Sequence, residues 1–187
     1  GELQLNRRAA PALFSMDNAG RVIYVGTFSK TISPVLRLGF MVVPTVLVDT
    51  VADVVASLSP APDPALQMAV QTFLHEGHFL RHLRKMKRTY STRSAELVSE
   101  LRALGYETSV KGLSVLLRLE HGTQDRLIAQ HAGDYGLAPS PLSVWYCAGI
   151  PAQAGLLLGL ATVEGEKTRQ ACQSLDGLIR RFSRQDK

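Results

Sequence analysis

The sequence predicts an α/β protein from three features of its hydropathy pattern. Two short apolar segments, 22–25 and 38–43, flank a loop rich in hydroxyl side chains, as at the edge of an α/β domain. A long helical region follows them, and shorter segments of alternating type begin after Gly105. The 187 residues are 45% hydrophobic and 20% charged, which is ordinary for a globular protein with a sizeable core.

The first part of the chain is predicted to form two strands and a helix. A turn at 17–20 leads into the first strand, and Pro44 ends the second. Residues 46–58 have apolar side chains at helical spacing. The segment 59–64 contains three prolines, which cannot continue a helix.

Residues 65–104 are predicted to be helical, with a break between two helices at Gly77. Apolar side chains in this region repeat at spacings of three, four or seven, so they share one stripe of the helix surface. The stripe consists of Phe79, Leu83, Met86, Tyr90, Leu97, Leu101 and Leu104. An amphipathic helix is therefore expected.

The chain after Gly105 is predicted to form a small α/β domain. Strands are expected at 115–119 and 156–161, and helices at 125–133 and 164–182. The last helix begins with acidic residues and ends with basic ones, which agrees with the direction of its dipole.

The loop between the first two strands carries the most chemically informative residues. A lysine amine, here Lys30, forms an imine with a carbonyl, and partial burial favours the neutral amine. The guanidinium of Arg37 suits phosphate, and Thr27, Ser29 and Ser33 offer hydroxyl donors. This set fits an aldehyde cofactor that carries a phosphate. The alternative is a solvated lysine and an arginine paired with a carboxylate.

Two longer segments carry a resemblance to a known family. Residues 26–40 resemble the cofactor-lysine segment of fold-type I pyridoxal-phosphate (PLP) enzymes, and more narrowly that of the aminotransferase-like domain of MocR-type transcription regulators, a branch of the GntR family. Residues 76–90 resemble the matching helix of these regulators. The implied fold is the C-terminal portion of a PLP-dependent transferase (fold type I) domain, with a small C-terminal α/β domain.

The resemblance also implies roles for the loop residues. In that family the lysine forms the Schiff base with PLP and the arginine binds the cofactor phosphate, so these roles fall on Lys30 and Arg37. Thr27 and Ser29 would lie near the phosphate. The expected cofactor of the intact protein is pyridoxal 5'-phosphate.

The same resemblance implies three parts for the chain. Residues 1–64 would be an incomplete remainder of the large PLP-binding domain, 65–104 a connecting helical region, and 105–187 the small domain. The glycine-rich phosphate loop, the aromatic residue on the pyridine ring and the aspartate facing the ring nitrogen are expected before Gly1. Without that aspartate the ring is a weaker electron sink, and efficient catalysis is not expected from this chain by itself.

The function implied is the effector-binding and dimerisation half of a PLP-dependent GntR/MocR-type regulator. Its partners would be a second copy of itself, an amino-compound effector, and DNA reached only through a preceding helix-turn-helix domain. The alternative is a fragment of a class I/II aminotransferase acting on amino acids. Many such enzymes place a carboxylate-binding arginine near Leu157, and leucine cannot supply that charge. A third possibility is a dimerisation module with vestigial cofactor residues.

Other features support weaker hypotheses. The basic segment 81–88 invites a nucleic-acid interpretation, but a solvated face of an amphipathic helix is favoured. His75, His78 and His82 lack further ligands for a metal site, and no metal is expected. Cys147 and Cys172 suit two reduced thiols, and a cytoplasmic location with no membrane segment is expected. A net charge of +5 and a pI near 9.5 permit contact with a polyanion without identifying one.

Overall fold

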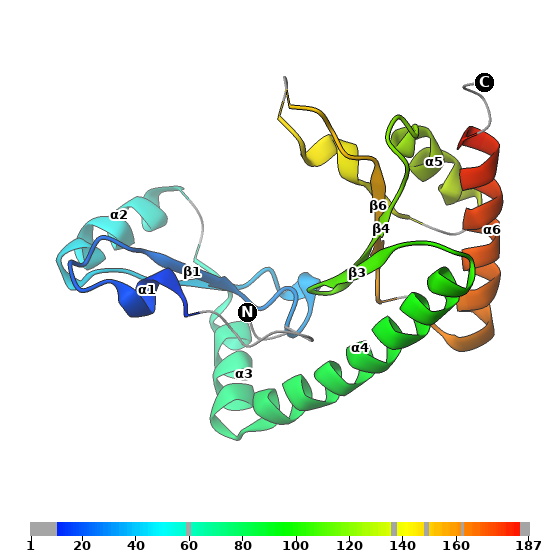
Figure 1. The fold of residues 1–187 in the computed structure, drawn as a ribbon. Helices are drawn as coiled ribbons and strands as arrows, with labels where there is room; N and C mark the ends of the chain where they lie inside the picture. The colour runs from blue at the N-terminus through cyan, green and yellow to red at the C-terminus, as the bar shows by residue number, and fades with distance from the viewer. Residues whose placement is uncertain (1–10, 59–60, 136–137, 148–149, 162, 184–187) are drawn as a thin grey trace. The chain divides into compact units, whose positions relative to one another are not determined.

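The chain divides into two units that meet within a single helix. The computed structural model describes residues 11–58, 61–135, 138–147, 150–161 and 163–183. The first unit ends at Lys85 and the second begins at Met86, inside the helix α4, His78–Ala103 (Figure 1). The same helix therefore supplies side chains to both units. The predicted limits at 64 and 104 remain predictions.

The described part of the first unit contains an antiparallel pair of strands and three helices that precede α4. Its elements are α1 (Leu13–Met16), β1 (Tyr24–Thr27), the 3₁₀ turns η1 (Pro34–Leu36) and η2 (Thr45–Leu47), β2 (Gly39–Val42), α2 (Val48–Leu58) and α3 (Pro64–His75). The register places Tyr24 opposite Val42 and Thr27 opposite Gly39. The two predicted strands and the predicted helix are confirmed, with shifted ends.

The first strand begins two residues later than predicted because of Asp17. Its carboxylate accepts hydrogen bonds from the backbone N–H groups of Arg21 at 2.6 Å and Val22 at 2.7 Å. The N–H of Val22 is thus engaged by the turn and is not part of the strand ladder. These backbone hydrogen bonds, led by that of Ala19, also lower the pKa of Asp17.

Gly77 separates α3 from α4, as the sequence predicts. Its φ of 73° lies in the left-handed region, which an α-helix cannot contain. At the other end of α3, the Asp63 side chain accepts the N–H of Ala65 at 2.8 Å and Pro64 occupies the first turn. The break and the start of α3 thus follow from local chemistry. Part of the proline-rich segment, residues 59–60, lies outside the described residues.

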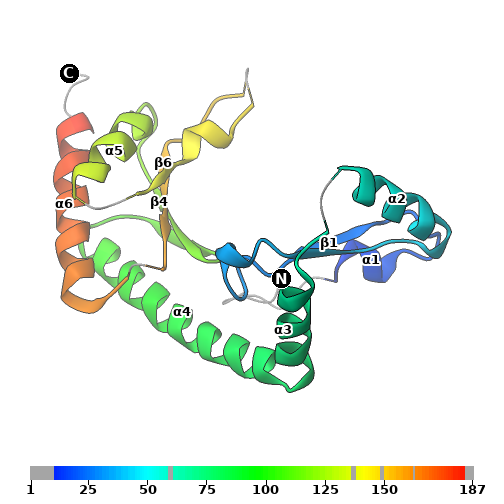
Figure 2. The same cartoon turned by 180° about the vertical axis from the view of Figure 1, so that it is seen from behind.

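The second unit is built on a four-stranded antiparallel sheet. Its elements after α4 are β3 (Thr108–Lys111), β4 (Ser114–Arg118), α5 (Asp125–Ala132), η3 (Gly133–Tyr135), β5 (Ser140–Pro141), η4 (Leu142–Trp145), β6 (Gly155–Gly159) and α6 (Gly165–Ser183). The strand order is β3-β4-β6-β5, so β4 and β6 are central (Figures 1 and 2). β3 and β5 were not predicted from the sequence, because β3 is polar and short and β5 has only two residues.

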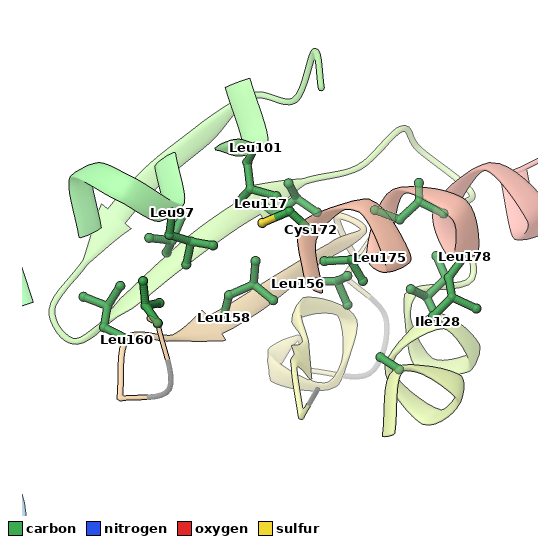
Figure 3. Close-up of a cluster of buried hydrophobic side chains, with 14 of the residues drawn as sticks. Leu97, Leu101, Leu117, Ile128, Leu156, Leu158, Leu160, Cys172, Leu175 and Leu178 are labelled. Atoms are coloured by element: carbon green, nitrogen blue, oxygen red, sulfur yellow. The ribbon is translucent and has the colours of Figure 1, made fainter. Parts of the chain in front are cut away.

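The core of the second unit lies on one face of this sheet. Val115 of β4 is paired with Leu158 of β6, and Leu117 with Leu156, so these four side chains point to the same face. Leu97 and Leu101 of α4, Ile128 of α5 and Cys172, Leu175 and Leu178 of α6 cover them (Figure 3). Burial is the first cause that raises the pKa of the Cys172 thiol to about 11, followed by nearby Glu100 and Glu96. Cys172 therefore acts as a packing residue.

Three polar side chains link the segment after α4 to α6. The Tyr106 hydroxyl donates to Asp176 at 2.7 Å, and the guanidinium of Arg180 donates to the same carboxylate at 2.9 Å. Burial by itself would raise the pKa of Asp176, but the hydrogen bonds from Tyr106 and Arg180 outweigh burial and lower it.

None of the helices among the described residues is long and apolar enough to span a membrane.

Leu117→Ala should strongly destabilise the second unit, because Leu117 has no exposed surface. We expect the free energy of unfolding to fall by about 2–5 kcal/mol. Leu127→Ala is the matched control, since Leu127 is 37% exposed on α5 and its truncation leaves a smaller cavity. Urea denaturation followed by circular dichroism measures both losses. Equal losses would contradict this description of the core.

Tyr106→Phe should raise the pKa of Asp176, because it removes one donor to the ionised carboxylate. Since the folded-state pKa of Asp176 is lowered, its contribution to stability is present above the unfolded-state pKa and is lost as the pH falls. The variant should lose less stability than the wild type on acidification. A carboxyl-detected NMR titration measures the pKa, and an unchanged value would refute the role of the hydroxyl.

Candidate functional site

The four predicted site residues lie in one connection of the first unit. Thr27 ends β1, Ser29 and Lys30 follow in a turn, and Arg37 stands two residues before β2 begins. β1 and β2 are antiparallel neighbours, so the chain must reverse direction within this connection. The loop predicted from the sequence is therefore a hairpin connection that gathers all four residues.

Phe28 closes the turn that carries Lys30. Its N–H donates to the carbonyl of Leu38 at 3.1 Å, which extends the strand ladder by one step. Its carbonyl accepts from the N–H groups of Ile32 at 2.8 Å and Ser33 at 3.2 Å. Lys30 thus lies between Phe28 and the two residues whose N–H groups donate to the Phe28 carbonyl. The role of Phe28 in the turn was not predicted, because main-chain hydrogen bonds leave no pattern of residue types in a short loop.

Aromatic side chains anchor the same turn. The ring of Phe28 lies 5.5 Å from that of Phe40 on β2 and 6.3 Å from that of Phe79 on α4, edge to face. Phe40 in turn lies 6.0 Å from Tyr24 and crosses over Gly26, its register partner. Ring pairs at such distances add about 0.5–1.5 kcal/mol each beyond the area they bury. The turn is therefore fixed by side chains as well as by its backbone.

The hydroxyl groups are partly organised among themselves. The Thr27 hydroxyl lies 3.0 Å from the Ser29 hydroxyl, and it accepts from the N–H of Ser29 at 3.2 Å. The Ser33 hydroxyl instead accepts from the N–H of Val35 at 3.3 Å and caps η1. Thr27 and Ser29 thus form a hydroxyl pair at the end of β1, while Ser33 stabilises the loop.

Arg37 has an uncommon backbone conformation. Its φ of 50° and ψ of 30° place it in the left-handed region, where no other non-glycine residue of the described ranges lies. For a residue with a Cβ this conformation costs about 1–2 kcal/mol. Strain of this kind is often found at functional sites, where a side chain is placed at the expense of stability.

The two cations of the site are open to binding partners. Lys30 and Arg37 are both exposed, and neither forms an ion pair with any residue that the structure describes. The alternative in which Arg37 pairs with a carboxylate therefore has no partner within those ranges. The partial burial that the sequence analysis expected of Lys30 is not found, because its side chain is exposed in the described structure.

In the second unit, Leu157 lies on the sheet face opposite the core. It is paired with Leu116 on one side and Ser140 on the other, and it is only half buried. Ser140 thus lies beside the position where many aminotransferases have an arginine. Arg118 does not replace that arginine in an obvious way, because its guanidinium contacts Glu107 at 3.3 Å and Gln153 at 2.9 Å.

A buried carboxylate, that of Asp125, holds the segment that follows Ser140. Its role was not predicted from the sequence. Asp125 is 2% exposed and accepts hydrogen bonds from the Ser143 N–H at 2.9 Å, the Ser143 hydroxyl at 2.6 Å and the Gly155 N–H at 3.2 Å. It therefore ties α5, η4 and β6 together. Burial of a carboxylate is tolerated because it accepts several donors. An aspartate in the first helical turn resembles an ordinary helix cap in sequence, so nothing marked it.

The histidines show other contacts. His78 lies 3.0 Å from Glu76, and the rings of His78 and His82 pack on Phe73. Among the described residues, no group of three or more potential ligands is arranged to hold a metal ion. Cys147 is exposed and Cys172 is buried, and neither forms a disulfide.

Comparison with known families decides the classification. The family model for aminotransferase class I and II matches residues 3–175. The chain belongs to this family.

Two curated relatives are transcription regulators. The chain is 35% identical over 179 residues to the rhizopine catabolism regulatory protein MocR of Rhizobium meliloti, covering 93% of the chain and 36% of that protein. It is 32% identical over 180 residues to the helix-turn-helix-type transcriptional regulator YhdI of Bacillus subtilis, covering 94% and 38%. The chain thus spans little more than a third of these relatives. The predicted resemblance to MocR-type regulators is confirmed.

Solved structures confirm the fold. The multiple substrate aminotransferase of Thermococcus profundus superposes with a TM-score of 0.83 at 22% identity, covering 97% of the chain and 46% of that enzyme. LysN, the α-aminoadipate aminotransferase of Thermus thermophilus, superposes with a TM-score of 0.80 at 25% identity, covering 97% and 48%. The predicted fold, the C-terminal portion of a fold-type I domain, is therefore correct.

Gly26→Ala should disturb the aromatic anchor of the Lys30 turn, because a Cβ at Gly26 would overlap the ring of Phe40. We expect a loss of about 1–3 kcal/mol in unfolding free energy and a weaker near-ultraviolet circular dichroism signal. Gly159→Ala is the control, since a Cβ at this other strand glycine meets no atom within 4 Å. Similar signals from the two variants would show that the Phe40 contact does not matter.

Proposed function

We propose that this chain is the effector-binding and dimerisation part of a PLP-dependent GntR/MocR-type transcription regulator. The observation that carries the proposal is the β1–β2 connection, which brings an amine, a guanidinium and a hydroxyl pair together on one loop. The 35% identity to MocR over nearly the whole chain supports the assignment to a regulator. DNA would be bound by a separate helix-turn-helix domain of the full protein.

The residues of the loop fit PLP by their chemistry. When bound, the cofactor supplies an aldehyde that reacts reversibly with amines and a pyridine ring that withdraws electrons. Lys30 would bond the aldehyde carbon, and Arg37 would bind the phosphate through two parallel hydrogen bonds. Thr27 and Ser29 would add hydroxyl donors near the phosphate. A loop whose two cations have no carboxylate partner in the described ranges is available for these contacts.

The effector class follows from the same chemistry. An amino compound competes with Lys30 for one carbonyl, so the site would sense amines. Binding can shift the protein between two arrangements only if the effector has different affinities for them. Release of the Lys30 side chain is the local change that such competition would produce. We propose a homodimer as the regulated assembly.

The second candidate is a fragment of a class I/II aminotransferase. The superposition on the Thermococcus profundus aminotransferase, with a TM-score of 0.83, shows that the fold is compatible with this hypothesis. Leu157 favours the regulator, because it offers no charge for a substrate carboxylate where many of these enzymes have an arginine. Under the enzyme hypothesis, Lys30 would also move a proton on the substrate.

Incubation with PLP, followed by borohydride reduction and peptide mass spectrometry, tests the site. We expect one saturable adduct on Lys30, which Lys30→Ala removes and Lys111→Ala leaves unchanged. Arg37→Gly should weaken PLP binding by roughly 10–100-fold, through the loss of a charge-assisted contact, without destabilising the chain, since glycine suits the left-handed conformation.

Pyridoxal, which lacks the phosphate, provides the matched control. Arg37→Gly should leave its adduct with Lys30 unchanged, because the contact that the variant removes is absent. Weak labelling scattered over many lysines would refute the proposed site. An oxo acid formed from an added amino acid would favour the aminotransferase alternative over the regulator.

A further inference from the structure

The first half of α4 carries four basic residues on one side. Arg81, Arg84, Lys85 and Arg88 are spaced by three, four and seven residues, so they lie along a single helical stripe. All four are exposed. We call them the basic stripe. Although the sequence identifies the charges, only the continuous helix aligns them.

The basic stripe lies opposite the apolar stripe of the same helix. Phe79, Leu83, Met86 and Tyr90 are half buried, and in a helix of 3.6 residues per turn they fall on the side facing away from the basic residues. Packing of the apolar side therefore directs the charges together into solvent. A helix with randomly placed lysines and arginines would instead spread its charge around the whole surface.

No acidic side chain compensates these charges within the helix. The sequence from His78 to Ala95 contains no aspartate or glutamate. None of the four residues forms an ion pair within the described ranges. Some basic residues elsewhere are paired: those at 118, 167, 169 and 180 each have a carboxylate oxygen within 3.6 Å. The stripe is thus a line of positive charge without internal neutralisation.

We propose that the basic stripe binds the phosphate backbone of duplex DNA. The stripe extends over seven residue steps, or about 10 Å along the helix axis. Phosphates of one strand advance by about 3.4 Å per base pair along the duplex axis, so the stripe spans about three base-pair steps. The contact would be independent of sequence, and it would add affinity to that of a separate DNA-binding domain. This inference rests on the proposed function as a regulator, which supplies DNA as the polyanion.

The composition of the stripe favours a duplex over other polyanions. No aromatic residue lies among its members to stack on exposed bases, as single-strand binders require. Its members lie at three levels about one helical turn apart, at 81, 84–85 and 88, which suits the regular spacing of a backbone. Arginine provides three of the four charges and is the residue that pairs most specifically with phosphate.

Fluorescence anisotropy with a labelled duplex of arbitrary sequence tests the proposal. The logarithm of the binding constant of this chain should fall linearly with the logarithm of the salt concentration. Arg84→Gln/Arg88→Gln should reduce the magnitude of that slope by about 2, because each lost phosphate contact contributes about 0.9. Arg84→Lys/Arg88→Lys should retain the slope, because it preserves both charges.

The matched control has the same change in net charge. Lys111→Gln/Arg126→Gln removes two exposed basic residues of the second unit that form no ion pair in the described ranges, and it should leave the slope unchanged. Equal effects of the two glutamine variants would overturn the proposal, since they would reflect net charge alone. The absence of duplex binding at low salt would also overturn the proposal. Equal stripe-dependent binding to vesicles of anionic lipid would overturn it as well.

The PLP adduct separates this inference from the proposed function. Arg84→Gln/Arg88→Gln should still form the Lys30 adduct, because neither residue belongs to the β1–β2 connection. An intact adduct together with a failed DNA test would reject the stripe alone. A failed adduct with a stripe-dependent slope would reject the cofactor site and retain the surface as a DNA contact.

Discussion

The apolar stripe of α4 is the constraint on which most of this structure depends. At the start of the helix, Phe79 packs edge to face on Phe28 and so helps to hold the turn that carries Lys30. Near its end, Leu97 and Leu101 are buried in the core of the second unit. The basic residues in the first half of the helix lie on the side opposite these apolar side chains, as a period of 3.6 residues per turn requires.

The first unit shows a surface typical of elements that pack on both sides. No residue of β2 or α2 is buried, and large apolar side chains such as Val35 and Val46 are 83% and 87% exposed. A two-stranded ribbon is marginally stable in water unless further strands or a helix cover it. The chain spans little more than a third of its curated relatives, so additional protein is available in those relatives to cover such surfaces. The turn that carries the candidate site is therefore well fixed, whereas the neighbouring elements β2 and α2 are incompletely covered.

The chemistry of the turn explains how sensing and catalysis can share one scaffold. Under the proposed function, the amine of Lys30 and the guanidinium of Arg37 would bind a phosphorylated aldehyde in a regulator and in an enzyme alike. Turnover requires further groups that bind the substrate carboxylate and stabilise charge on the ring. Leu157 supplies no charge beside Ser140, and Arg118 is engaged with Glu107 and Gln153. These residues favour recognition of an amine over its conversion.

Local sequence patterns were enough to predict the longer helices and the central strands, and they singled out the four candidate site residues. Hydropathy period is a local property, so the stripe of α4 and the strand β4 could be predicted to within a few residues. The lysine and arginine stood out because their chemistry is distinctive even without coordinates. The resemblance to a family, carried by residues 26–40 and 76–90, supplied the fold class.

The contacts that support these elements depend on the folded chain. The role of the Phe28 carbonyl, the left-handed conformation of Arg37 and the burial of Asp125 depend on residues that meet after folding. The short strands β3 and β5 exist because β4 and β6 offer them hydrogen-bonding edges, and their own residues carry little strand signal. Pairing partners distant in sequence determine such features, and no local pattern records them.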